Sequence, residues 1–123
     1  MNKNACAIIV RNPGAGYEEI RQKVDSAIRR GRTRFLSGME YGAGLTAAEY
    51  VLSCKEGFPE ITLECVIPIE EYTTVWDEPS RERYFAVLSR CDTETMLQRS
   101  FAADCLHRQR EYLLRHSEET III

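Results

Sequence analysis

A glycine-rich segment, residues 35–49, runs Phe-Leu-Ser-Gly-Met-Glu-Tyr-Gly-Ala-Gly-Leu-Thr-Ala-Ala-Glu and has the pattern of a strand, a turn and a helix. Its three glycines allow positive φ angles and a close approach of the backbone to a ligand. The first N–H groups of the following helix carry partial positive charge. The segment therefore predicts a phosphate site, although a tight turn needs glycine even without a ligand. The predicted binding residues are Ser37, Gly38, Gly42 and Gly44.

Two further side chains suit the sugar and the base of a nucleotide. Glu49 follows the glycine turn within the expected helix, close enough to the strand ends to accept a hydrogen bond from a ribose hydroxyl. Its alternative role is that of a solvated helix carboxylate. Trp76 follows a polar loop, where its ring can stack on a base with Tyr84 behind it. The alternative for Trp76 is a cover over the hydrophobic core.

Arg99 and Arg108 are the best cations for a phosphate, because a planar guanidinium pairs with two oxygens at once. His107 and His116 lie nine residues apart and do not form a metal-binding pair. The sequence has no G-x-S-x-G elbow and no glycine loop followed by Lys-Ser or Lys-Thr. We therefore expect no catalytic residue, no metal and no cofactor.

Composition restricts the class of protein. The chain has 123 residues, enough for a single domain over 1–123. Its net charge of -3 argues against a nucleic-acid partner held by bulk charge, and no apolar run is long enough to cross a membrane. Four basic residues are expected to complement a helix dipole: Arg29, Arg30, Arg32 and Arg34. Five cysteines without metal spacing, with Cys6 and Cys65 in apolar runs, favour a reducing cytoplasm.

Short apolar runs alternate with helical patterns, which is typical of an α/β fold with a mostly parallel five-stranded sheet. The expected strands are Ala5–Val10, Thr33–Ser37, Ile61–Ile67, Thr93–Leu97 and Thr120–Ile123. The expected helices are Tyr17–Arg30, Leu45–Lys55, Ser80–Arg90 and Ala103–Arg115. Gly31 and Gly57 are expected to end the first two helices, and Tyr17 is expected in the buried stripe of the first. Ligands of such sheets bind beyond the carboxyl ends of the strands, which include the loop 98–100.

Several short motifs along the chain resemble those of one family. They are Cys6-Ala7-Ile8, Ser37-Gly38-Met39 with Gly42 and Ala47-Ala48-Glu49, Val66-Ile67-Pro68, Trp76, Glu82-Arg83-Tyr84, and Cys105 with Arg108 and Tyr112. From about Ala5 to Ile123 the chain is similar to the YpsA-like family of the SLOG superfamily, which also holds DNA-processing protein A and the "lonely guy" phosphoribohydrolases. The resemblance implies a Rossmann-like three-layer α/β/α sandwich and a nucleotide-derived ligand such as ADP-ribose.

The chain also departs from that family. Of the family's first loop, Thr-Gly-His-Arg-Pro, only Pro13 is kept, and Gly44 replaces the acidic residue of a Gly-Val-Asp pattern. The Gly-Gly-Thr turn after the last strand is missing, which suggests a diverged or C-terminally truncated member. We expect a ligand-binding sensor. The alternatives are an N-glycosidic hydrolase assisted by Glu49, and an interaction module whose final strand, 121–123, pairs with a partner or a second copy.

Overall fold

Strands and helices alternate along the residues that the structure, a computed structural model, describes: 3–99 and 101–123. The strands are β1 (Ala5–Ile9), β2 (Arg34–Ser37), β3 (Thr62–Ile67), β4 (Thr93–Met96) and β5 (Glu119–Ile122). The helices are α1 (Tyr17–Arg29), α2 (Ala43–Cys54), α3 (Glu78–Arg90) and α4 (Cys105–Arg115).

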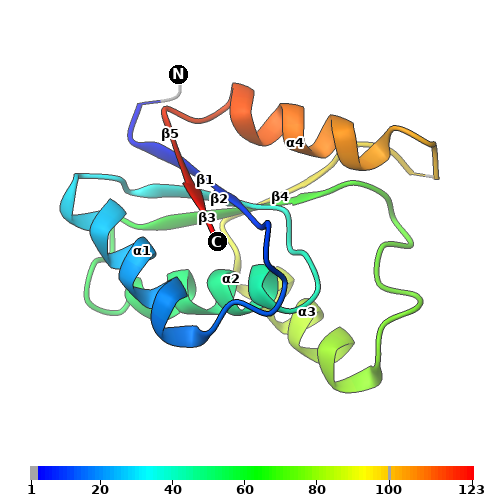
Figure 1. Ribbon diagram of the computed structural model, residues 1–123, viewed down its shortest axis with the longest axis horizontal. Helices are drawn as coiled ribbons and strands as arrows, with labels where there is room; N and C mark the ends of the chain where they lie inside the picture. Colours follow the sequence, from blue (N-terminus) through cyan, green and yellow to red (C-terminus); the bar gives the residue numbers. More distant parts are fainter. Residues whose placement is uncertain (1–2, 100) are drawn as a thin grey trace.

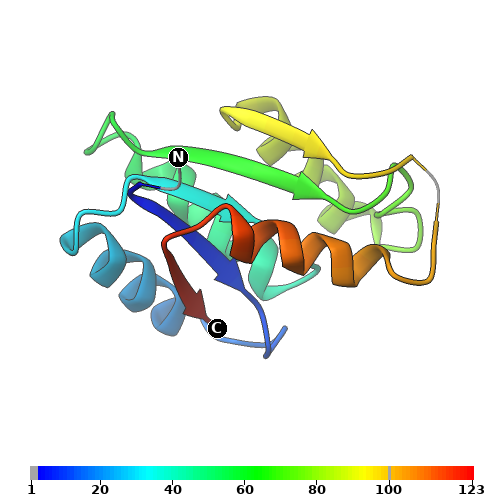
Figure 2. The same ribbon diagram turned by 90° about the horizontal axis from the view of Figure 1, so that it is seen from above.

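The five strands form one sheet in the order β4-β3-β2-β1-β5, and every neighbouring pair is parallel. Helices α1, α2 and α3 cover one face and α4 covers the other (Figure 1). The chain moves outward from β1 to β4, and α4 then returns it to β5 on the other side of β1 (Figure 2). The strand order therefore reverses between β1 and β5. This is the expected three-layer sandwich, with a sheet that is wholly parallel.

Alternating side chains of β1 build two separate cores, one on each face of the sheet. Cys6 and Ile8 belong to the large core under α1, α2 and α3. Ala5, Ala7 and Ile9 pack with Leu113 of α4 in the smaller core. Because every residue of β1 is buried, the strand reads as a continuous apolar run, which is typical of a central parallel strand.

Most predicted boundaries agree with the structure to within two residues, and Cys6 and Cys65 are buried as expected. Helix α2 begins at Ala43, two residues before its expected start, so Gly44 lies inside its first turn. Two expectations about single residues are wrong. Tyr17 is 57% exposed and packs edge-on against Tyr50 instead of joining the buried stripe. A left-handed glycine follows α1 at Gly31, with φ +92°, whereas Gly57 does not adopt positive φ.

The basic cluster after α1 has partners at the start of β5. Arg30 pairs with Glu119, and the Nε of Arg32 lies 2.7 Å from a Glu119 carboxylate oxygen. Arg32 also pairs with Glu118. These ion pairs join the α1–β2 turn to β5, in addition to any interaction with the helix dipole, which was the role expected from the sequence.

The outer edge of β5 is less apolar than three consecutive isoleucines suggest. Ile121 and Ile123 are buried, and Ile122 is 40% exposed. Lys23 of α1 donates a hydrogen bond of 2.5 Å to the backbone carbonyl of Ile122. A charged side chain at an edge strand opposes pairing with another strand. None of the described helices has the length and apolar character needed to cross a membrane.

Candidate functional site

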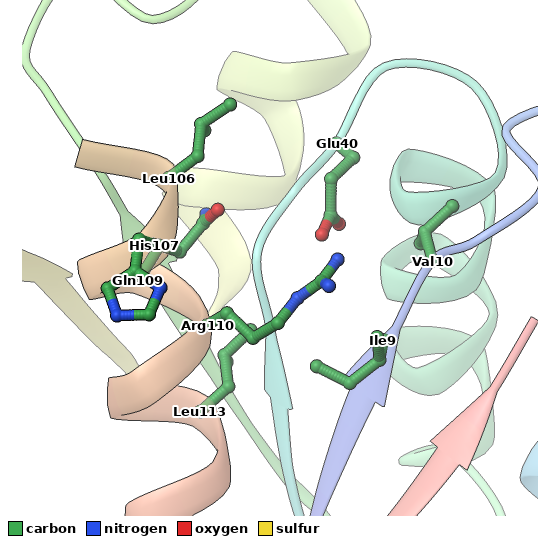
Figure 3. A pocket seen from close by; sticks show the side chains of 8 residues that line it. All are labelled: Ile9, Val10, Glu40, Leu106, His107, Gln109, Arg110 and Leu113. Carbon is green, nitrogen blue, oxygen red and sulfur yellow. The ribbon is translucent and has the colours of Figure 1, made fainter. Parts of the chain in front are cut away.

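A cavity of about 320 Å³ lies at the carboxyl ends of β1 and β2, beneath α4 (Figure 3). It borders β1, next to which the strand order reverses, and this is where ligands bind in open parallel sheets. Its lining combines an apolar floor with four polar side chains. The lining residues are Ile9, Val10, Glu40, Leu106, His107, Gln109, Arg110 and Leu113.

Glu40 follows β2 and folds its carboxylate over the glycine turn. One carboxylate oxygen lies 2.8 Å from the position that a Cβ on Gly38 would occupy, and the other lies 2.6 Å from a Cβ on Gly44. A side chain at either position would therefore collide with this carboxylate. Gly38 and Gly44 therefore make room for the Glu40 side chain, whereas the sequence suggested that they make room for a ligand.

The Glu40 carboxylate is incompletely satisfied. Its Oε1 is buried and has no hydrogen-bond partner among the described residues. Burial raises the pKa of Glu40, while its own backbone N–H and the charge of Arg110 oppose that rise. Figure 3 shows Arg110 extending from α4 toward Glu40 across the cavity. Glu40 and Arg110 thus bring opposite charges to the lining of the cavity.

Gln109 holds α4 against the ends of two strands. The pairing between β2 and β3 ends at Ser37 and Cys65, and the carbonyls of Gly38 and Val66 belong to the next residue along each chain segment. The Gln109 side-chain amide donates to both carbonyls, at 2.8 and 2.9 Å. Because Gln109 is buried, this clamp fixes the helix that carries Arg110 and His107 over the cavity.

The glycine turn has a different backbone from the one expected. Of the three predicted glycines only Gly42 adopts positive φ, at +81°, and Met39 is also left-handed, at +56°. Ser37 is buried, and its hydroxyl accepts a hydrogen bond of 3.0 Å from the amide of Met39. The expectation that all three glycines provide positive φ for a ligand is therefore wrong.

Two of the first amides of α2 are already bonded within the chain. The N–H of Ala43 donates to the carbonyl of Pro13 at 2.8 Å, and that of Leu45 donates to the carbonyl of Glu40 at 2.9 Å. The Glu40 carboxylate also places negative charge beside this helix end. The turn is consequently a poorer cradle for a phosphate than its sequence suggests.

The other expected residues lie outside the cavity lining. Glu49 is held by Arg83 of α3 through two hydrogen bonds of 2.6 and 3.0 Å, so it joins α2 to α3. Trp76 is half-buried in an aromatic cluster, with its ring centre 5.3 Å from Tyr41 and 5.4 Å from Tyr84. It packs against the large core, which favours the alternative of a core cover.

The two predicted phosphate cations are also not among the residues that line the cavity. Arg99 is exposed in the loop after β4, and its neighbour Ser100 lies outside the described residues. Arg108 is exposed on α4 and bonds to Asp104 at 2.8 Å. It borders a separate hollow beside Tyr112. Arg108 thus points away from the cavity that Arg110 borders, although the two share a helix.

The spacing of residues along α4 could have indicated which of its side chains face the sheet. Cys105, Gln109 and Leu113 are buried at intervals of four residues and mark the inner face of α4. That face carries Gln109 toward the strands and leaves Arg110 beside the cavity. Within the described ranges, no group of three or more His, Cys, Asp or Glu side chains is arranged to hold a metal ion.

The protein has the parallel sheet, the strand order and the helices on both faces that define a Rossmann-like α/β fold, and it has a cavity at the ends of its strands. The sequence profile of the YpsA family, described as the YspA SLOG family, matches residues 17–123. The chain therefore belongs to this family.

Curated relatives support the assignment. A UPF0398 protein of Halalkalibacterium halodurans is 29% identical over 104 residues, which cover 83% of this chain and 55% of that protein. The UPF0398 protein YpsA of Bacillus subtilis strain 168 is 30% identical over 78 residues, covering 63% of this chain and 43% of that protein. The chain thus spans about half the length of the relatives that it matches.

Proposed function

We propose that the protein binds a small nucleotide-derived ligand in the cavity beneath α4 and acts as a sensor. The observation that carries the proposal is the pair of opposed charges, with Glu40 on one wall and Arg110 on the other. Arg110 pairs with a phosphate, because a guanidinium offers parallel donors to its oxygens. Glu40 accepts a hydrogen bond from another part of the same ligand. Ile9 and Val10 supply apolar contact between them.

The size of the cavity favours a mononucleotide over a dinucleotide. Its volume of about 320 Å³ lies at the lower end of the range for small-molecule sites. A single phosphate, a sugar and a base match this volume better than two linked nucleotides. A ligand as large as ADP-ribose would extend past the cavity toward solvent.

Sensing is a better proposal than hydrolysis. The hydrolase alternative assigned departure of the base to Glu49, but Arg83 holds both of its carboxylate oxygens. We further infer a cytoplasmic location, since all five cysteines are free thiols and three of them are buried.

Calorimetric titration of the full chain with AMP, ADP and ADP-ribose tests the proposal. We expect AMP to bind and Arg110→Gln to weaken it by about 10-fold or more, as expected for loss of a charged hydrogen bond. Arg108→Gln is the matched control, because it removes the same charge from the same helix outside the cavity. A protein that binds none of these compounds at millimolar concentration, or an equal loss in both variants, would contradict the proposal.

A further inference from the structure

We propose that Cys65 and Cys91 form a reversible modification site, at which a small-molecule disulfide converts the two thiols into an internal disulfide bond. The two cysteines belong to different elements of the chain: Cys65 lies within β3, and Cys91 directly follows α3. Neither cysteine lines the ligand cavity, so the site is independent of the proposed function.

The fold brings the end of α3 against the strand that carries Cys65. Cys65 is buried in the large core under α1, α2 and α3, and Cys91 is partly buried and packs against the same core. The next residue, Asp92, is fixed to β3 from both sides. Its N–H donates to the Leu63 carbonyl, and its carboxylate accepts from the Leu63 N–H, both at 2.9 Å. These two bonds hold Cys91 beside β3.

The two thiols are neighbours in this arrangement and lie within hydrogen-bonding distance of each other. The Cys91 sulfur also lies 3.3 and 3.4 Å from the carbonyl oxygens of Leu88 and Thr93, which accept weak hydrogen bonds from it. A thiol is a weak donor, so these contacts leave the Cys91 side chain free to rotate. Rotation toward Cys65 brings the two sulfurs toward the separation of about 2 Å that a disulfide requires.

Cys91 is the thiol that reacts first. It is partly exposed, whereas Cys65 is buried. Burial raises the pKa of both thiols, but the hydrogen bond between them lowers the pKa of Cys91 and adds to the rise at Cys65. Because the thiolate is the attacking form, Cys91 opens the small disulfide and Cys65 completes the internal bond. The raised pKa values make the reaction slow.

The exchange takes place in two steps. The Cys91 thiolate attacks one sulfur of the small disulfide, which forms a mixed disulfide and releases one small thiolate. The Cys65 thiolate then attacks the Cys91 sulfur, which forms the internal disulfide and releases the second small thiolate. The two released thiolates take up the protons that the cysteines lose. Two protein thiols are thus oxidised while one small disulfide is reduced to two thiols, and an excess of small thiol reverses the reaction.

The new bond would anchor the edge of the sheet. It closes a loop over residues 66–90, which contains α3 and leads to the edge strand β4 (Figure 2). Three of the four residues of β4 are exposed, so side-chain packing holds this edge weakly. Because a cross-link restricts the unfolded chain, oxidation is expected to stabilise the fold.

Incubation of the reduced full chain with glutathione disulfide at pH 8.5 tests the site, followed by alkylation, trypsin digestion without reduction and mass spectrometry. We expect a loss of two hydrogen atoms from the intact mass and a link between the tryptic peptides 56–81 and 91–99, which contain Cys65 and Cys91 as their respective cysteines. The melting temperature is expected to rise by about 5 °C or more and to return with dithiothreitol.

Two variants separate this pair from the other cysteines. Cys91→Ser is expected to abolish both the link and the rise in melting temperature. Cys54→Ser is the matched control, because Cys54 is also partly exposed and lies at the end of a helix, and it is expected to keep both.

The inference is overturned if the wild-type chain keeps all five thiols, carries glutathione without an internal link, or links another pair of cysteines. A rise in melting temperature that persists in Cys91→Ser would overturn it as well. Peptide mapping of the wild-type chain needs no variant, so the test holds even if Cys91→Ser fails to fold.

Discussion

Replacing Gln109 by leucine tests the clamp that positions the cavity. The Gln109 amide donates to the carbonyls of Gly38 and Val66, which follow the last residues that β2 and β3 pair with each other. Leucine has a similar volume but no donor. The substitution therefore leaves two buried carbonyls unpaired while preserving most of the packing between α4 and the sheet.

The expected magnitude follows from those two carbonyls. Leaving one buried polar group unsatisfied costs about 1–3 kcal/mol, and the apolar leucine offsets part of the total. We expect the free energy of unfolding to fall by about 2–4 kcal/mol, a large share of the roughly 5–15 kcal/mol that stabilises a typical domain. The melting temperature of a domain of this size falls by about 3–5 °C per kcal/mol, so the decrease is at least about 6 °C.

Urea unfolding followed by circular dichroism measures the change. Gln22→Leu is the control, because it makes the same substitution on the exposed face of α1 and is expected to alter stability by less than about 0.5 kcal/mol. If Gln109→Leu unfolds at the same urea concentration as the wild-type chain, the two hydrogen bonds do not hold α4 in place. The position of Arg110 over the cavity would then need another explanation.

Three further predictions concern the elements around the site. Gly42→Ala is expected to lower the free energy of unfolding, measured in urea, by about 1–3 kcal/mol, because residue 42 has φ +81° and a Cβ there would lie 2.5 Å from the backbone oxygen of Pro13. The control Gly57→Ala is expected to be nearly neutral, because a Cβ at residue 57 has open space around it. Asp77→Ala should cost about 1 kcal/mol in thermal unfolding, since the carboxylate caps the first turn of α3, and Asp77→Asn should retain most of the cap. Hydrogen bonding to Arg30 lowers the pKa of Glu119. The contribution of Glu119 to stability is therefore present above the ordinary pKa of 4.5 and is lost as the pH falls through the lowered value. Glu119→Gln is expected to reduce the fall in melting temperature on acidification.

The strands were predictable because local pattern and burial agree. The five residues of β1 are all buried, and their apolar side chains indicate a central strand. The start of α2 was predicted two residues too late because no side chain caps it: its N-cap is Gly42. The N-cap Asp77, in contrast, has a side chain that accepts a hydrogen bond from the first turn of α3.

The cavity was less predictable because its walls come from distant parts of the chain. Glu40 and Arg110 lie seventy residues apart, and their approach depends on the crossing of α4 over β1 and β2. The ion pair between Glu49 and Arg83 was equally hard to predict from the sequence. Glu49 has the type and position expected of a ligand-binding carboxylate, but Arg83 lies on a neighbouring helix and bonds to it. A sequence pattern identifies a polar residue near the strand ends without showing which neighbour it contacts.

The same glycine pattern before a helix can accompany either positive or negative charge at the turn. Glycines before a helix suggest a positive cradle, because free amides face the ligand. Here the space above Gly38 and Gly44 holds the carboxylate of Glu40, and Pro13 bonds the first amide of α2. The turn therefore presents an acceptor to the cavity, and the positive charge comes from Arg110 on the opposite wall. The charges that line the cavity therefore come from two distant segments, the glycine turn and α4.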